Sequence, residues 1–264
     1  MRNNIRKFKI RKIIQSVFFS IILLLFATLI KGDLNNAHPF CPYSSVCFGP
    51  MLLKGFLIFP ISVIGGLIIA FLSMFFGRKF CSYVCFLGTL QEYIYKLNLK
   101  KNKFNQKIPQ KYHRILIILK YMVFAFTLIA AFFSIQYTFM KYCPVLNLAF
   151  PTKIGVISGF VLFIIFVVGF FVERFWCRYL CPYAALMNLF QYLGKLIGVK
   201  RTKIFRNIKT SINCFNCENY CPMHIDIGYN EKISDPNCIQ CYRCVRICSK
   251  TETSKSKCIY KDNI

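Results

Sequence analysis

The run CIQCYRCVRIC near the end of the chain constrains its fold most, because its cysteines follow a C-x2-C-x2-C-x3-C spacing. Few sites other than an iron–sulfur cluster need four thiols at this spacing. A second group upstream, Cys214, Cys217 and Cys221 with a proline after it, repeats the last three cysteines of the run. The two groups predict a pair of 4Fe-4S clusters and a role in electron transfer. The run itself contains Cys238, Cys241, Cys244 and Cys248.

One of the two clusters, called cluster B here, has a complete set of ligands. In the usual two-cluster pattern, each cubane takes the first three cysteines of one run and the last cysteine of the other. Cluster B then takes Cys238, Cys241 and Cys244, with Cys221 as its fourth ligand. Zinc ribbons also contain paired C-x2-C knuckles, but a ribbon has no use for the additional cysteines of this segment. We therefore prefer the iron–sulfur interpretation.

The other cluster, cluster A, is one cysteine short. It takes Cys214, Cys217 and Cys248, and Ser211 stands where the remaining cysteine belongs. Three alternatives are open. Ser211 ligates through oxygen, Cys258 supplies a thiolate from the end of the chain, or cluster A is a three-iron or labile centre.

The distribution of apolar residues places most of the chain in a membrane. Hydrophobic residues make up 56% of the sequence, and most of the excess lies before residue 175. Four segments are long enough to cross a hydrocarbon core of about 30 Å, which takes roughly 20 helical residues. We expect an α-helical integral membrane domain over residues 1–200 and a small α+β domain of the bacterial-ferredoxin type over 201–264. The four segments are 13–30, 56–77, 115–136 and 154–173.

The net charge of +26 is arranged around these apolar segments. Basic residues concentrate before the first segment and between the second and third, whereas the other two connections hold few. The positive-inside rule then predicts a protein of the bacterial inner membrane with both termini on the cytoplasmic side. We expect no nucleic-acid partner, because the basic residues form no stripe on a soluble face. Lys120 and Glu173 lie near the cytoplasmic ends of two segments, where snorkelling would bring their side chains to water.

The membrane part of the chain is duplicated. The segment RKFCSYVC at 78–85 aligns with RFWCRYLC at 174–181, at a constant offset of 96 residues. Residues four apart in a helix share a face, so the two cysteines of each C-x3-C pair would point the same way. Two such pairs, related by pseudo-symmetry, form a candidate four-thiolate site. The alternatives are a thiol redox pair, a contact with a partner's cluster, or ordinary small apolar residues. The cysteines are Cys81, Cys85, Cys177 and Cys181.

Each C-x3-C pair is followed by an amphipathic stretch, at 90–99 and 186–197, which we expect to be a helix on the inner membrane surface.

The predicted outer loops carry a repeated Cys-Pro pair. Cys41 precedes the second apolar segment and Cys143 precedes the fourth, while Cys47 follows in the first of these loops. Under the predicted topology these cysteines face an oxidising compartment, where disulfides persist. Cys41 pairs with Cys47 in one alternative and with Cys143 in the other. His38 beside them is a candidate quinone or metal contact, although a lone loop histidine is more often solvated.

The motifs GRKFCSYVCFLGTLQE, RFWCRYLCPYAAL and NCFNCENYCPMHIDI, with the long cysteine run, resemble the polyferredoxin-like 4Fe-4S membrane proteins. This family includes the NapH-type quinol dehydrogenase subunits, and the resemblance covers nearly the whole chain. It implies four spans, two inner C-x3-C-P motifs, two cytoplasmic 4Fe-4S clusters, and electron flow from the quinone pool. The chain departs from the family pattern at Phe86, where proline is expected, at Ser211, and in the outer loop HPFCPYSSVCFGP.

The preferred function is therefore a membrane-bound iron–sulfur protein that passes electrons between quinol and a respiratory or redox partner. Arg243, Arg246 and Lys250 lie beside cluster B and either favour its reduced form or make only a solvated basic face. An alternative is a redox or metal-handling assembly factor whose C-x3-C pairs bind copper or exchange disulfides. A third is a passive anchor that docks a soluble ferredoxin. The sequence has no haem C-x2-C-H motif and no flavin or nicotinamide fingerprint, so any enzymatic activity is expected to be redox only.

Overall fold

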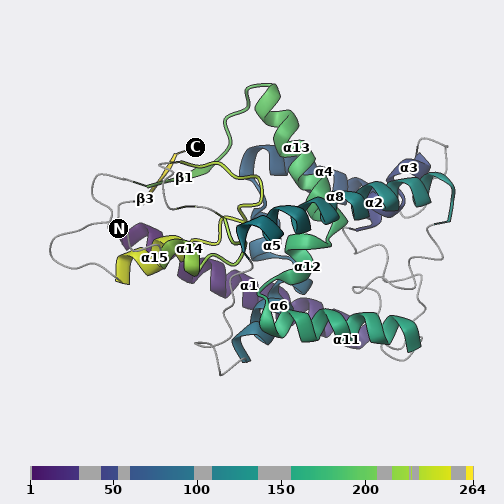
Figure 1. Ribbon diagram of the computed structural model, residues 1–264, viewed down its shortest axis with the longest axis horizontal. Helices are drawn as coiled ribbons and strands as arrows, with labels where there is room; N and C mark the ends of the chain where they lie inside the picture. Colours follow the sequence, from purple (N-terminus) through teal and green to yellow (C-terminus); the bar gives the residue numbers. More distant parts are fainter. Residues whose placement is uncertain are drawn as a thin grey trace.

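The two sequence repeats fold as matching three-helix units in the computed structural model (Figure 1). The structure describes residues 2–29, 43–52, 60–97, 109–135, 156–206, 216–225, 227, 232–250 and 260–263. The first repeat consists of α4 (Pro60–Phe76), α5 (Lys79–Tyr83) and α6 (Phe86–Leu97). The second consists of α11 (Val156–Phe171), α12 (Phe175–Tyr179) and α13 (Pro182–Leu196). Each helix of the second repeat begins 96 residues after its counterpart, so the duplication inferred from sequence extends to the first residue of each helix.

The two repeats pack against each other through unlike helices. The apolar helix of each repeat lies against the amphipathic helix of the other, because α4 contacts α13 and α11 contacts α6. A further long helix covers each unit. α1 (Arg2–Leu29) contacts α5 and α6, and α8 (Gln110–Phe132) contacts α12 and α13. Two short helices, α2 (Ser44–Cys47) and α3 (Gly49–Leu52), pack against α8. The loops that carry the C-x3-C motifs therefore meet where the repeats cross.

The C-x3-C motif does not form one continuous helix, contrary to the expectation from its i, i+4 spacing. In each repeat the first cysteine lies on a five-residue helix, and the second follows a break at Val84 or Leu180. Pro182 enforces the break in the second repeat, because its ring leaves no N–H for a preceding helical turn. Cys181 is extended there and caps α13. Phe86 replaces the proline in the first repeat, and α6 still begins at this residue.

Each of the four predicted spans contains a helix: α1, α4, α8 and α11. In the part of the chain that the structure describes, Lys111–Phe132 is the one helix both long and apolar enough to cross a membrane. Ser62–Phe76 and Val156–Phe171 are apolar but shorter. Four membrane-spanning helices therefore remain a prediction. The amphipathic stretches are helical, as expected, and much of α13 is buried.

The C-terminal part is α+β. It contains α14 (Asn216–Asn219), α15 (Arg243–Lys250) and the strands β1 (Lys203–Arg206), β2 (Lys232–Ile233) and β3 (Tyr260–Asn263). The strands form an antiparallel sheet in the order β2-β1-β3, with Ile204 opposite Ile233 on one side. α15 contacts α1 near the start of the chain (Figure 1). The buried core also runs from one part into the other, because Cys81 and Cys181 share it with Cys241 and Cys244.

Candidate iron–sulfur sites

The four ligands predicted for cluster B line one cavity. Cys221, Cys238, Cys241 and Cys244 reach it from two separate segments of the C-terminal part. The remaining wall is largely apolar, and its aliphatic residues include Ile204, Ile225, Ile227, Ile233 and Ile239. Thiols in an apolar cavity are the donor set and surroundings of a cysteine-ligated iron–sulfur cluster.

The electrostatics of this cavity also fit such a cluster. The pKa of Cys238 is raised to about 12 and that of Cys221 to about 11, mainly by burial and in smaller part by the charges of neighbouring thiolates. Burial likewise raises the pKa of Cys244, followed by the charges of Cys241 and Cys238. A bound iron–sulfur cluster would supply the positive iron charge that holds these thiols as thiolates.

Among the described residues, no three His, Cys, Asp or Glu side chains are close enough to hold one metal ion. A cubane instead distributes four thiolates over four iron atoms, so its ligands lie farther apart than those of a single ion.

The loop of cluster B is held in an unusual backbone conformation. Gln240 and Tyr242, on either side of Cys241, have φ angles of 50° and 56°. In this left-handed region the backbone of a non-glycine residue is about 1–2 kcal/mol less stable than in the right-handed region. The Gln240 side chain donates a 2.8 Å hydrogen bond to the carbonyl of Thr202, which secures the loop against the segment leading into β1. The loop thereby curves around the cavity.

Most of the predicted cluster A set lies outside the described residues. Cys217 is buried on α14. Ser211, Cys214 and Cys258 are not described, and neither is the side chain of Cys248 on α15. The three alternatives for its fourth ligand therefore stay open.

The two C-x3-C pairs come together where the repeats cross. Cys81, Cys85, Cys177 and Cys181 form what we call the four-thiol group. Burial raises the pKa of Cys177, and the charges of Cys85, Cys181 and Cys81 raise it further. Burial raises the pKa of Cys85 to about 12, again with contributions from Cys81 and Cys181. The four side chains therefore lie within electrostatic reach of one another, and three of them are at most 6% exposed.

Donors in each repeat point at the second cysteine of its pair. The Ala184 N–H donates to Cys181 Sγ at 3.3 Å. The N–H of Gly88, the counterpart of Ala184 in the first repeat, donates to the Cys85 sulfur. The hydroxyl of Tyr43 also lies 3.2 Å from Cys181 Sγ. Both sulfurs thus sit at helix N-termini, where the helix dipole favours negative charge.

Two buried arginines connect the two repeats by hydrogen bonds. Arg174 Nη1 donates to the carbonyl of Cys81 at 2.8 Å, and Arg78 Nη2 donates to the carbonyl of Cys177 at 3.3 Å. The two arginines and the two cysteines are both related by the 96-residue offset. The hydrogen bonds are therefore a pseudo-symmetric pair that joins each cysteine loop to the other repeat.

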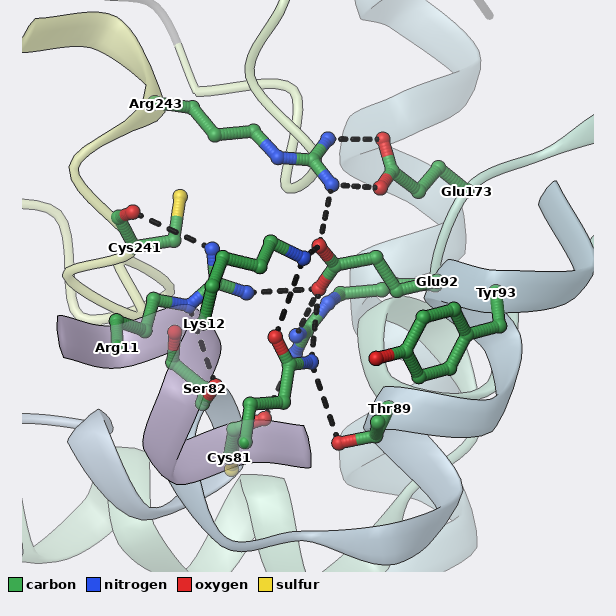
Figure 2. A network of polar contacts seen from close by, with 12 residues as sticks. Arg11, Lys12, Cys81, Ser82, Thr89, Glu92, Tyr93, Glu173, Cys241 and Arg243 are labelled. Carbon is green, nitrogen blue, oxygen red and sulfur yellow. Dashed lines mark hydrogen bonds and ion pairs between the residues drawn. The ribbon is translucent and has the colours of Figure 1, made fainter. Parts of the chain in front are cut away.

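A single buried carboxylate, that of Glu92, binds several cations close to Cys81 and Cys241 (Figure 2). Glu92 is 1% exposed and pairs with Arg11 at 2.7 Å, Arg174 at 2.9 Å and Arg243 at 2.7 Å, and also with Lys12. Burial alone raises the pKa of Glu92, but these cations outweigh it and lower the pKa well below its usual range. Glu92 is therefore a permanent anion. We call it and its partners the Glu92 network.

The Glu92 network joins the two repeats to the cavity of the predicted cluster B. Arg243, between two cluster B cysteines, pairs with Glu173 at 2.6 Å as well as with Glu92. Arg11 donates to the carbonyls of Ser82 at 3.2 Å and Cys241 at 3.4 Å (Figure 2). One guanidinium thus touches the backbone of both cysteine loops.

Two expectations from sequence are wrong at this point. Glu173 and Lys120 do not snorkel. Glu173 is bound by Arg243, and the fully buried Lys120 donates to Asn237 Oδ1 at 2.8 Å. Arg243 is likewise not part of a solvated basic face. Sequence reasoning missed Glu92, although it is one of only nine acidic residues in the chain and lies in an amphipathic helix.

The predicted outer site lies mostly outside the described residues. Cys47 ends α2 and is half-buried. Cys41, Cys143 and His38 are not described, so the disulfide alternatives remain predictions.

Comparison with known proteins identifies the repeats and their relatives. A family model described as a 4Fe-4S binding domain matches twice, at residues 58–105 and 154–200, each covering one C-x3-C motif. The uncharacterised protein MJ0750 of Methanocaldococcus jannaschii is 34% identical over 72% of this chain and 76% of its own length. YccM of Escherichia coli, whose name gives it a proposed role in electron transport, is 29% identical over 71% of this chain and 54% of its own. The ferredoxin-type protein NapH of Haemophilus influenzae is 26% identical over 72% and 66%. No solved structure is a significant match.

Proposed function

Because this chain belongs to the polyferredoxin-like 4Fe-4S family, we propose that it is a membrane-bound iron–sulfur protein that carries electrons between quinol and a protein redox partner. The observation that carries this proposal is the cavity lined by Cys221, Cys238, Cys241 and Cys244. Cluster A, with Cys214, Cys217 and Cys248, completes a two-cluster relay in the proposal.

The exposed apolar surface supports the membrane location. Large contiguous apolar surfaces are rare on soluble monomers and mark contacts with membranes or other proteins. We place α1, α4, α8 and α11 in a bacterial inner membrane, with both termini in the cytoplasm by the positive-inside rule. Their exposed side chains include Val17, Phe18, Ile21, Leu24, Ile64, Ile68, Phe71, Ile118, Met122, Phe126, Phe160, Phe163 and Val167.

The proposed reaction has two parts, oxidation of a quinol and transfer of its electrons through the iron–sulfur clusters. Oxidation of a quinol releases two electrons and two protons, and the protons leave to water. A bound iron–sulfur cluster supplies one-electron transfer, so the two electrons pass singly to a redox partner. The residues of this chain hold and tune the centres. The cysteines ligate, the isoleucine wall excludes water, and Arg243 and Arg11 place positive charge that favours the reduced state.

The proposal is tested by anaerobic reduction of the purified protein with menaquinol and ubiquinol analogues. Electron paramagnetic resonance and bleaching of the visible cluster absorbance follow the reduction. We expect reduction of wild type and of the control Cys47→Ser, and loss of the cluster B signal in Cys238→Ser/Cys241→Ser. Iron-loaded wild type that neither analogue reduces would rule out the quinol role.

The second candidate function is a metal-handling assembly factor. One contact favours it: Cys81 Sγ lies 3.7 Å from the thioether sulfur of Met187, and thiolate with thioether is a ligand set that suits Cu(I). Stoichiometric copper bound by the purified chain, lost on Met187→Leu, would support this function over the quinol role.

A further inference from the structure

The four-thiol group has the geometry of a shared ligand site. Each repeat contributes two sulfurs, one from a short helix and one from the N-terminus of the next helix. Backbone N–H groups of Gly88 and Ala184 already donate to Cys85 and Cys181. Hydrogen bonds of this kind stabilise a thiolate more than a thiol, so the site is preorganised for metal ligation.

On the Arg78 side of the four-thiol group, the described residues include no carboxylate partner. Arg78 is fully buried, and within the described residues it has no carboxylate partner; its acceptors are the Cys177 carbonyl and Asn237 Oδ1. Among the described residues its buried Nε has no hydrogen-bond partner. Lys120 is also fully buried; it donates to the same Asn237 oxygen and lies within electrostatic reach of Asp235. A buried cation without a carboxylate partner, such as Arg78, is costly unless a nearby group supplies negative charge.

The repeat relationship shows where a compensating carboxylate is missing. Glu92 neutralises Arg174 in one half of the molecule. The residue 96 positions later is Asn188, whose neutral amide lies 2.9 Å from Asn237 and next to the Arg78 side of the site. Arg78 therefore faces the thiols of Cys81, Cys177 and Cys181 in place of a carboxylate.

We propose that Cys81, Cys85, Cys177 and Cys181 together hold a third iron–sulfur cluster, a 4Fe-4S centre shared by the two repeats. This inference rests on the proposed iron–sulfur function and assigns to the repeats a site separate from clusters A and B. Four thiolates on a cubane give a net negative centre, which supplies the negative charge that Arg78 lacks. A single metal ion fits less well, because no three of the described His, Cys, Asp or Glu side chains are close enough to share one.

The third cluster lies next to cluster B. Arg11 bonds the carbonyl of Ser82, which follows Cys81, and the carbonyl of Cys241. Cys81, Cys181, Cys241 and Cys244 belong to one buried core. The site therefore stands between the apolar helices and the C-terminal clusters, where electrons from a membrane quinol would enter.

Iron and acid-labile sulfide per chain test the inference. Wild type purified anaerobically should contain about twelve iron atoms, about eleven if cluster A is a three-iron centre, or about eight if cluster A is labile and is lost. A chain with serine at all seven C-terminal ligand cysteines should keep about four, with a Mössbauer signature of a 4Fe-4S centre. Adding Cys81→Ser or Cys177→Ser to that chain should remove them equally, because the repeats contribute equivalently. Cys47→Ser should leave them in place.

Several results would overturn the third cluster. These are no iron in a folded chain without the C-terminal ligands, an iron content of otherwise wild-type protein that Cys81→Ser/Cys177→Ser leaves unchanged, or zinc or copper at the four thiols. The second comparison keeps the C-terminal ligands, so it stands even if the chain without them fails to fold. If the third cluster is absent, reduction of clusters A and B by quinol analogues can still be measured. The two proposals can therefore fail independently.

Discussion

Arg174 donates a 2.8 Å hydrogen bond from Nη1 to the carbonyl of Cys81, while its Nη2 pairs with Glu92. The same guanidinium therefore fixes the first cysteine of one repeat and binds the buried anion of the Glu92 network. The planar guanidinium group holds its two Nη donors in fixed, different directions. A lysine ammonium on its flexible chain does not reproduce this arrangement.

Arg174→Lys should therefore lose one of these two contacts although it keeps the charge. A hydrogen bond to or from a charged group is worth about 1.5–3 kcal/mol, so we expect a destabilisation of this size. Thermal unfolding in detergent measures it. Arg114→Lys on the exposed face of α8 is the matched control and should unfold like wild type. An equal Tm for both variants would show that the fork has no structural role.

Glu92→Gln should be more damaging, because it leaves Arg11, Arg174 and Arg243 without their common anion. Breaking a buried ion pair costs about 3–5 kcal/mol. For a chain of this size each kcal/mol lowers Tm by roughly 2–4 °C, so a loss of about 10 °C is expected. Lys96→Gln, an exposed change of one charge on the same helix, is the control. A Tm loss no larger than that of the control would contradict a central role for Glu92.

Arg78→Met should affect the iron-loaded protein and the iron-free protein differently. Without iron, removing a buried cation that lacks a carboxylate should leave Tm unchanged or raise it. With iron, the same change removes positive charge beside the proposed third cluster. It should then lower both Tm and the reduction potential of that centre, because less positive charge disfavours the reduced state. Redox titration followed by electron paramagnetic resonance reads the second effect. A response that does not depend on iron would argue against an anionic centre at the four thiols.

The sequence was sufficient for local features and insufficient for pairings between distant segments. The 96-residue repeat, the helices and the four cysteines around the cluster B cavity follow from spacing, since periodicity and ligand order are written locally. The Glu92 network does not, because its cations lie 80 residues or more away in the chain. Glu173 was misjudged for the same reason: its partner, Arg243, comes from the C-terminal part. The i, i+4 rule failed at the C-x3-C motifs because the helix breaks within them.

His113 should stabilise the contact between α8 and the second repeat. Its Nδ1 lies 2.8 Å from the hydroxyl of Tyr179, and both side chains are buried. His113→Phe keeps a ring at this position but removes the hydrogen bond, so the Tyr179 hydroxyl loses a partner. A hydrogen bond of this kind contributes about 0.5–1.5 kcal/mol to stability, and we expect a destabilisation of this size. Thermal unfolding in detergent measures it, and Lys111→Gln, at an exposed position of the same helix, is the control. An equal Tm for His113→Phe and the control would show that this hydrogen bond contributes no stability.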